Sequence, residues 1–329
     1  MASLYVTKNG VSLGLKNNRI YISKEGEETK EIPIHKIDRI LIFEGVKISS
    51  NLIQYAIENN IDITFLKGSG QYLGRISGGE NDRVDIVRKQ ILLTGNDDFR
   101  IEMSKKIIDS KLNNQITLLN RRKKIDESII KNIEQMKRMK NSINKCKSIE
   151  EIMGYEGISA KEYFEGISKT INEEFAFEGR SKRPPKDMFN AMISMAYTLL
   201  FSEINSITAS KGLYVYAGFM HSDKKGHPAL ISDFIEEWRP VICDSTVISI
   251  INKKWIKKED FNFNNDGSVY LNQNGRKILV EHMTRKLNSE INYFDKKMSY
   301  RDALSRQVES FIDVLKNEDT SLYKVSNIR

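Results

Sequence analysis

Two kinds of hydrophobic periodicity divide the chain near residue 80. In the first part, apolar and polar residues alternate in short runs such as SLYVT, RIYIS and KIDRILIF, and turn residues such as Asn9-Gly10 separate several of the runs. Alternation with a period of two is typical of half-buried β-strands. The segment NLIQYAIEN (51–59) is the one short helix expected there. Residues 1–79 are therefore predicted to form a small β-sandwich-like domain.

A glycine-rich stretch, GSGQYLG (68–74), lies between two of the expected strands. Such glycines can cradle phosphates when a strand precedes them and a helix follows. Here the spacing is GxGxxxG, and the residues that follow read as a strand. The stretch is therefore predicted to be a hairpin turn rather than a phosphate-binding loop.

The period changes to that of helices after Gly78-Gly79. Ile101, Ile108, Leu112, Ile116 and Leu119 recur at spacings of three, four and seven, and segments 187–201 and 281–315 continue in the same style. A polar patch at 261–275, FNFNNDGSVYLNQNG, interrupts it as a loop or small hairpin. Residues 80–329 are predicted to form one large all-helical domain, which makes the fold class α+β.

Composition excludes several classes of protein. The longest apolar run, MISMAYTLLF (192–201), is far short of the roughly 20 residues of a membrane span. The first residues, MASLYVTKNG, lack the basic-then-apolar pattern of a signal peptide. Cys146 and Cys243 lie far apart and form no CxxC pair, so neither a disulfide framework nor a thiolate zinc site is expected. These features favour a cytoplasmic protein.

Positive charge is concentrated in one segment. The chain has a net charge of +8, and residues 105–147 contain 13 Lys or Arg against 4 Asp or Glu, a local net of +9. Such a segment suits a polyanionic partner, because contacts to phosphates release counterions. A solvated helix face would have the same composition. Charge alone leaves both interpretations open.

Candidate chemistry centres on GFMH (218–221) and SDFIEEW (232–238). His221 closes a run of small and aromatic residues, so it is either a packed structural histidine or a ligand. In a helix that begins near Pro228, Asp233 and Glu236 lie at i and i+3 on one face, whereas Glu237 points partly away. An imidazole and a carboxylate can form two corners of a metal site whose third ligand comes from elsewhere.

Two further segments bear on the hypothesis of a metal site, whereas the segment that contains His282 does not. Glu156, in GYEGISAKEYF, is the best candidate for the third ligand, although it also suits the acidic first turn of a helix. Arg180 and Arg183 precede a Pro-Pro stop and could grip phosphates, or could simply cap the following core helix. His282, in the charged stretch VEHMTRK, is expected to be solvated.

Five blocks together resemble the CRISPR-associated protein 1 family, the integrase of spacer acquisition. In order they are Lys111-Leu-Asn-Asn-Gln115, GYEGISAKEYF, GRSKRPPKDMFNAMISMAYTLL, GFMH and SDFIEEWRP. The resemblance covers nearly the whole chain and implies that Glu156, His221 and Glu236 are the metal ligands, with Asp233 as a neighbour. The chain departs from the family at Gly212-Leu-Tyr-Val-Tyr216, where Gly-Leu-Asp-Pro is common, and this puts the finer substrate contacts in doubt.

The resemblance also implies cofactors, partners and a reaction. One imidazole and two carboxylates suit Mg²⁺ or Mn²⁺. A DNA 3′-hydroxyl would attack the CRISPR repeat by direct transesterification, and water would give endonuclease activity instead. The family works as a homodimer that contacts itself largely through the β domains, and CRISPR-associated protein 2 bridges two such dimers. Double-stranded DNA is the expected ligand of the basic segment, with candidate contacts from Lys111, Arg121, Arg122, Arg180 and Arg183.

Two other hypotheses remain open at the level of sequence. The chain could be a DNA-binding scaffold without chemistry, or a general structure-specific repair nuclease. The sequence also leaves open whether Asp233 or Asp244 assists the three ligands.

Overall fold

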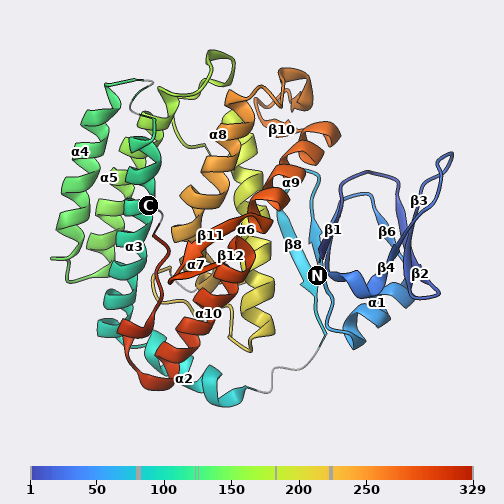
Figure 1. Ribbon diagram of the computed structural model, residues 1–329, viewed down its shortest axis with the longest axis horizontal. Helices are drawn as coiled ribbons and strands as arrows, with labels where there is room; N and C mark the ends of the chain where they lie inside the picture. Colours follow the sequence, from blue (N-terminus) through green and yellow to red (C-terminus); the bar gives the residue numbers. More distant parts are fainter. Residues whose placement is uncertain are drawn as a thin grey trace.

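The computed structural model describes residues 2–78, 83–122, 124, 126–181, 184–221 and 225–327. Figure 1 shows a β-rich part at one end of the molecule and a larger helical body at the other. The predicted mixed α+β class is confirmed, because strands concentrate in the first part of the chain and helices in the rest. The predicted domain boundary falls within residues 79–82, which lie outside the described residues.

Eight strands of the first part form two four-stranded sheets. One sheet has the order β1 (Ala2–Val6), β5 (Ile37–Phe43), β7 (Asp62–Leu66) and β8 (Tyr72–Ile76), in which β8 alone is antiparallel to its neighbour. The other has the order β4 (Lys30–Pro33), β3 (Arg19–Ser23), β2 (Ser12–Lys16) and β6 (Lys47–Ile48). A 3-10 turn, η1 (Ile34–Lys36), leads from β4 to β5.

The first sheet is buried on both faces, which attaches it to the helical body. On β5, Ile40 and Ile42 pack in a core shared with the second sheet and helix α1 (Ser50–Glu58). The alternate residues Leu41 and Phe43 belong to the core of the helical body. Burial on both sides explains why the segment IDRILIF is almost continuously apolar.

Two local predictions in this part are confirmed. Helix α1 forms where NLIQYAIEN was expected, and the Ser49 side chain caps it by accepting a hydrogen bond from the Leu52 N–H. The stretch from Lys67 to Gly70 is a hairpin turn between β7 and β8, in which the Lys67 N–H donates to the Gln71 carbonyl. Gly70 has a φ of +86°, a conformation that favours glycine.

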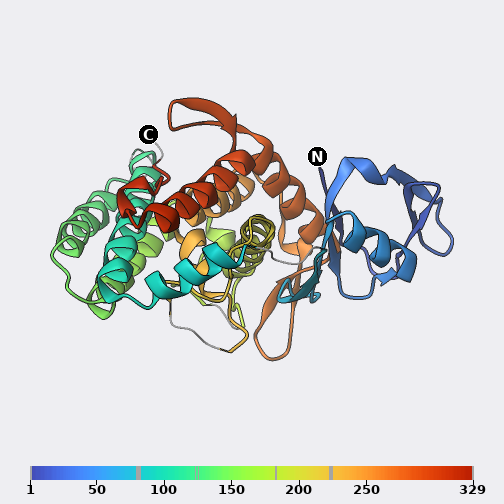
Figure 2. The same cartoon turned by 90° about the horizontal axis from the view of Figure 1, so that it is seen from below.

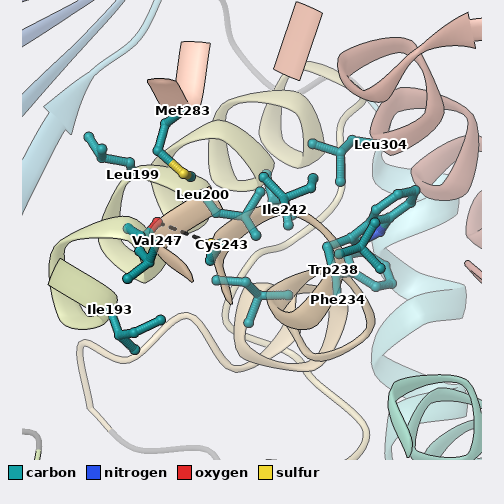
Figure 3. Packing of buried hydrophobic residues seen from close by; sticks show 14 of the residues in the cluster. Ile193, Leu199, Leu200, Phe234, Trp238, Ile242, Cys243, Val247, Met283 and Leu304 are labelled. Carbon is teal, nitrogen blue, oxygen red and sulfur yellow. Dashed lines mark hydrogen bonds between the residues drawn. The ribbon is translucent and has the colours of Figure 1, made fainter. Parts of the chain in front are cut away.

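The helical body is built from nine helices of the described residues and a π-helical turn. Asp187 caps the start of helix α6, because its side chain accepts a hydrogen bond from the Asn190 N–H at 2.7 Å. Trp238, at the end of α7, is fully buried near Phe234, Ile242 and Leu304 (Figure 3). The elements are α2 (Val84–Thr94), α3 (Asp97–Asn120), α4 (Ile129–Ile143), α5 (Ile149–Ser168), α6 (Met188–Ser210), α7 (Ala229–Trp238), the π-helical turn η3 (Arg239–Asp244), α8 (Ser245–Asn252), α9 (Gln273–Asn288) and α10 (Tyr300–Asn317), with 3-10 turns η2 (Glu173–Phe175), η4 (Lys258–Asp260) and η5 (Thr320–Leu322).

Two hairpins project from the helical body (Figure 2). The first, β9 (Phe261–Phe263) with β10 (Val269–Leu271), confirms the expectation for segment 261–275. The second, β11 (Glu290–Tyr293) with β12 (Lys296–Ser299), corrects the prediction that helical structure continues through 281–315. Its turn is made by Phe294 and Asp295, both with positive φ, and contains neither Gly nor Pro. The all-helical description of the second part is therefore too simple.

A buried ion-pair cluster joins the two parts of the chain. Glu203 of α6 accepts hydrogen bonds from Arg39 Nη2 of β5 at 2.6 Å and from Arg301 Nε of α10 at 2.9 Å. The Glu203 side chain is 1% exposed. The first sheet is thus fixed to the two helices by charge as well as by apolar packing.

No helix within the described part of the chain is long and apolar enough to cross a membrane.

Candidate functional site

Two carboxylates from distant segments converge on one buried ammonium group. Lys111 of α3 donates from Nζ to Glu236 Oε2 of α7 at 2.5 Å and to Glu156 Oε1 of α5. The Lys111 and Glu236 side chains are almost completely buried, and Glu156 is more exposed at 16%. Helix α3 packs against both α5 and α7, which brings these three positions together. The Glu156 and Glu236 oxygens therefore share a cation-binding point.

Arg239 neutralises the second oxygen of Glu236. It lies one helical turn further along, at the start of η3, and donates from Nη1 to Glu236 Oε1. Burial favours the neutral carboxyl, but the positive charges of Arg239 and Lys111, together with His221, outweigh it and lower the pKa of Glu236 to about 2. Burial alone would lower the pKa of Lys111, but the negative charges of Glu156 and Glu236 raise it. Lys111 therefore stays charged. Glu236 is therefore an anion at neutral pH.

Asp233 holds His221 and the backbone that precedes it. Asp233 Oδ1 accepts from the His221 backbone N–H at 3.0 Å and lies 2.7 Å from His221 Nδ1. Its Oδ2 accepts from the Phe219 and Met220 N–H groups. A Cβ on Gly218 would lie 2.7 Å from Asp233 Oδ2, so the turn needs glycine there.

This arrangement fixes which nitrogen of His221 can act. An ionised carboxylate only accepts hydrogen bonds, so His221 Nδ1 is the donor to Asp233, and in the neutral imidazole Nε2 is the nitrogen with the lone pair. The fully buried Asp233 has both oxygens occupied by the 219–221 segment, so it orients His221 rather than offering a free ligand.

The donor set suits a hard cation, although its three side chains do not form one cluster in the part of the chain that the structure describes. Within the described ranges, no group of three or more His, Cys, Asp or Glu side chains is arranged to hold a metal ion. Glu156 and Glu236 nevertheless meet at one positive charge, and His221 is held by Asp233, which lies one helical turn before Glu236 on α7. Two carboxylates and an imidazole nitrogen fit Mg²⁺ or Mn²⁺ by their chemistry.

Asp244 occupies a separate position behind Glu236. Its carboxylate accepts from the Tyr163 hydroxyl at 2.7 Å and from the Tyr197 hydroxyl at 2.8 Å. Burial raises the pKa of Asp244 to about 6. The Arg239 guanidinium lies over the Tyr197 ring, 4.8 Å from its centre. Asp244 and its two tyrosines are therefore linked to Glu236 through Arg239.

Glu237, expected to point partly away from the site, is buried and binds the C-terminal segment. It accepts from the Ser326 N–H at 2.6 Å, from the Ser110 hydroxyl at 2.8 Å and from the Tyr323 hydroxyl at 2.8 Å. Burial outweighs these hydrogen bonds and raises the pKa of Glu237 to about 7. Residues 323–326 are thereby fastened to α7 beside Glu236.

The five residues predicted to contact DNA fall in different surroundings. Lys111 is buried between the carboxylates, because its helix face turns inward, and so it belongs to the site rather than to an exposed face. Arg121 is exposed and Arg122 half-buried at the end of α3. Arg180 donates to Asn190 and Ser194 of α6 and lies over the Tyr197 ring, while Arg183 is outside the described residues.

Sequence reasoning did not single out Arg239, Tyr163 or Tyr197. Arg239 follows the acidic helix in the motif Trp-Arg-Pro, where its i+3 spacing from Glu236 is a detectable signal. The two tyrosines lie on separate helices, and only the fold brings them to one carboxylate.

The fold and site define an α+β protein in which carboxylates from two distant helices meet at one buried ammonium group. A sequence model described as CRISPR associated protein Cas1 matches residues 4–285. The chain belongs to this family.

Relatives named CRISPR-associated endonuclease Cas1 align over most of both chains. The Mycobacterium tuberculosis protein is 29% identical over 319 residues, covering 96% of this chain and 94% of the relative. A Chlorobaculum tepidum protein is 31% identical over 304 residues, covering 88% of each. The chain thus belongs to a family of CRISPR-associated endonucleases.

Solved structures share the fold at low sequence identity. A casposase bound to integration product has a TM-score of 0.88 at 22% identity and covers 100% of this chain and 96% of its own. A CAS1 protein from Thermotoga maritima has a TM-score of 0.83 at 23% identity, with coverage of 96% and 97%. A Cas6-RT-Cas1–Cas2 complex has a TM-score of 0.88 at 22% identity and covers 100% of this chain and 36% of that one.

Proposed function

We propose that this protein is a metal-dependent DNA integrase and endonuclease of CRISPR adaptation, which joins the 3′-hydroxyl ends of spacer DNA to the CRISPR repeat. The observation that carries the proposal is the convergence of Glu156 and Glu236 on one cation within a Cas1-family fold. The family's relatives are named endonucleases, and a casposase of the same fold was solved with an integration product.

Glu156, Glu236 and His221 would hold Mg²⁺ or Mn²⁺. Such an ion, when bound, supplies Lewis acidity toward the scissile phosphate and the departing oxygen. The protein prepares each ligand in advance: Lys111 and Arg239 keep Glu236 ionised, and Asp233 leaves His221 Nε2 as the available nitrogen. Lys111 holds the two carboxylates close together and limits their repulsion.

The remaining residues orient this centre. Glu236 and the Tyr197 ring fix the Arg239 guanidinium, which remains positively charged beside the place where a phosphate would approach. Asp244 in turn fixes the Tyr197 hydroxyl. Attack by a DNA 3′-hydroxyl would join strands, and attack by water would cleave one; in neither case does the chain need to supply a covalent nucleophile.

The proposed partners follow from the basic segment and from the solved relatives. Exposed Arg121, Lys131, Lys137 and Arg138 leave a positive surface on α3 and α4 for double-stranded DNA. Complexes of Cas1 with Cas2 share the fold, which supports CRISPR-associated protein 2 as a partner. A homodimer through the β-rich part, as the family resemblance implies, completes the proposed assembly.

Strand transfer tests the proposal. The protein and its Cas2 partner are incubated with Mg²⁺ or Mn²⁺, a duplex with free 3′-hydroxyls and a plasmid that carries the repeat. Glu156→Gln, His221→Ala and Glu236→Gln should each lower the rate of joining by roughly a hundredfold or more, because Lewis-acid stabilisation is worth several kcal/mol. Their affinity for the duplex should be retained.

Glu150→Gln is the matched control, because Glu150 lies exposed in the first turn of the same helix as Glu156. It should join strands like the wild type. If the three site variants also joined strands at the wild-type rate, the site assignment would be wrong. Wild-type protein that binds DNA but neither joins nor cuts would establish the scaffold hypothesis, and cutting without any preference for repeat DNA would favour a repair nuclease.

A further inference from the structure

One of the two tryptophans lies on the surface in a strongly basic segment. Trp238 is fully buried, whereas Trp255 is 41% exposed. Trp255 belongs to residues 253–258, Lys-Lys-Trp-Ile-Lys-Lys, here named the KKWIKK segment, which follows helix α8. An exposed tryptophan between lysines is an unusual use of a large apolar side chain, because tryptophans are on average highly buried.

The backbone holds Trp255 in a defined position. Helix α8 ends with Lys254 in the left-handed conformation at a φ of 56°. The Lys254 N–H donates to the Ile251 carbonyl at 2.9 Å, and the Trp255 N–H donates to the Ile250 carbonyl at 3.0 Å. This pair of bonds is the Schellman motif, which fixes the residues just after a helix. Buried Ile256 anchors the segment on its other side.

The Trp255 ring is already part of a stack. It lies 4.2 Å from the His282 ring of α9, centroid to centroid, with 22° between the planes. His282 is half-buried in this contact, so the prediction that it is solvated is wrong. The Lys253 ammonium lies 4.7 Å from the centre of the indole ring. The indole is therefore stacked on His282, has the ammonium of Lys253 over its ring, and is 41% exposed.

The charges around the ring are available for an anion. Lys253, Lys254, Lys257 and Lys258 are all exposed, and none makes an ion pair with another residue of the described ranges. Of the nearby acids, Glu259 is exposed and Glu281 lies 3.9 Å from Lys277. Repulsion among four neighbouring lysines favours the binding of a polyanion.

We propose that the KKWIKK segment is a second nucleic-acid contact, in which an unpaired base stacks on Trp255 and the flanking phosphates lie against the four lysines. A base would take the place of the exposed Lys253 ammonium over the indole and extend the stack that the indole makes with His282, and such stacking accepts any base. An acidic protein segment would match the charge but leaves the flat ring without a counterpart. The proposal rests on the proposed function only in taking DNA as the strand, and it shares no residue with the carboxylate site.

Tryptophan fluorescence measures this contact directly. With the full-length wild type and no divalent ion, a short oligothymidylate should quench the emission of Trp255, whereas fully buried Trp238 acts as an internal reference. An abasic oligonucleotide of equal length carries the same phosphates without bases, and it should quench far less. Equal quenching by both probes would show that the segment recognises charge alone, as an acidic protein partner would, and would overturn the proposal.

Variants separate stacking from charge. Affinity for a labelled oligothymidylate should fall roughly 5- to 150-fold in Trp255→Ala, the loss expected for one stacked base, and Trp255→Phe should recover part of it. In Lys258→Ala the slope of log affinity against log salt should become shallower by roughly 0.7, the value for one phosphate contact on a single strand. Unchanged affinity in Trp255→Ala, in protein whose circular dichroism matches the wild type, would refute the contact.

Failure of the KKWIKK contact can be distinguished from failure of the proposed function. Glu236→Gln removes a carboxylate of the other site, and it should bind the oligothymidylate with wild-type affinity. Loss of strand transfer with intact quenching would leave the KKWIKK contact standing. Intact strand transfer with no quenching would remove this contact and leave the proposed function unaffected.

Discussion

The ammonium group of Lys111 stands where the site requires positive charge, so its removal gives the sharpest prediction. Lys111→Met keeps most of the length and volume of the side chain and deletes its charge together with its hydrogen-bond donors. Glu156 then loses the ion-pair partner that the structure shows for it, while Glu236 keeps Arg239. The two carboxylates are then left without the ammonium group that joins them, and Arg239 compensates Glu236 alone.

The expected loss of stability can be estimated from these contacts. Removing one partner of a buried ion pair costs about 3–5 kcal/mol, because the remaining charge stays desolvated. The lower end applies here, since Glu156 is 16% exposed and Glu236 retains Arg239. A loss of about 3 kcal/mol corresponds to a fall in Tm of roughly 6–12 °C for a large domain.

Added Mn²⁺ should reverse much of this loss. A ligand at one hundred times its Kd stabilises the folded state by about 2.7 kcal/mol. In Lys111→Met the ion meets two uncompensated carboxylates, whereas in the wild type it must compete with the ammonium group. The increase in Tm on adding Mn²⁺, followed by differential scanning fluorimetry, should therefore be larger for Lys111→Met than for the wild type.

Lys106→Met is the matched control, because Lys106 lies on the same helix, is half-buried and makes no ion pair with a described residue. It should leave both Tm and the response to Mn²⁺ unchanged. The reasoning is refuted if Lys111→Met is as stable as the wild type, or if Mn²⁺ raises its Tm by no more than it raises that of the wild type.

Three further predictions concern buried carboxylates. Glu203→Gln, between the two arginines that join the β-rich part to the helices, should destabilise the protein by about 3–5 kcal/mol in urea unfolding, and an unchanged midpoint would contradict the clamp. Glu237 should keep its proton up to pH about 7 when folded and release it near 4.5 when unfolded, so stability should fall as pH rises through that window, and Glu237→Gln should flatten this slope in pH-dependent melts. Tyr197→Phe removes one of two hydroxyls from buried Asp244 and should cost about 1–3 kcal/mol, whereas a neutral effect on Tm would mean that Asp244 is satisfied without it.

Sequence patterns predicted the elements whose signals are local. The hairpin turn at Lys67–Gly70 and the helix α1 were recognisable from glycine spacing and from a short apolar repeat. The β11–β12 hairpin was not, because its turn uses Phe294 and Asp295 in place of Gly, Asn-Gly or Pro. Burial of β5 on both faces was also hidden, since it depends on how the sheet docks against the helices.

The candidate site likewise combines residues that local signals indicated with contacts that depend on the tertiary fold. Motif order pointed to Glu156, His221 and Glu236, which lie up to 80 residues apart in sequence, and spacing along α7 put Asp233 beside Glu236. The position of Lys111 was misjudged, since a lysine in a basic segment is ordinarily solvated. A local signal existed: Lys111, Asn114 and Gln115 interrupt the apolar face of α3, and polar residues on such a face need buried partners. Which partners they find depends on the tertiary fold.

The central claim is that Glu156, Glu236 and His221 act together on one divalent cation, and isothermal titration of Mn²⁺ into metal-free protein tests it most directly. Mn²⁺ should bind the wild type saturably, and this binding should be lost in the double variant Glu156→Gln/Glu236→Gln, strongly weakened in His221→Ala and retained in Glu150→Gln. Binding of Mn²⁺ to the double variant with wild-type affinity and stoichiometry would contradict it.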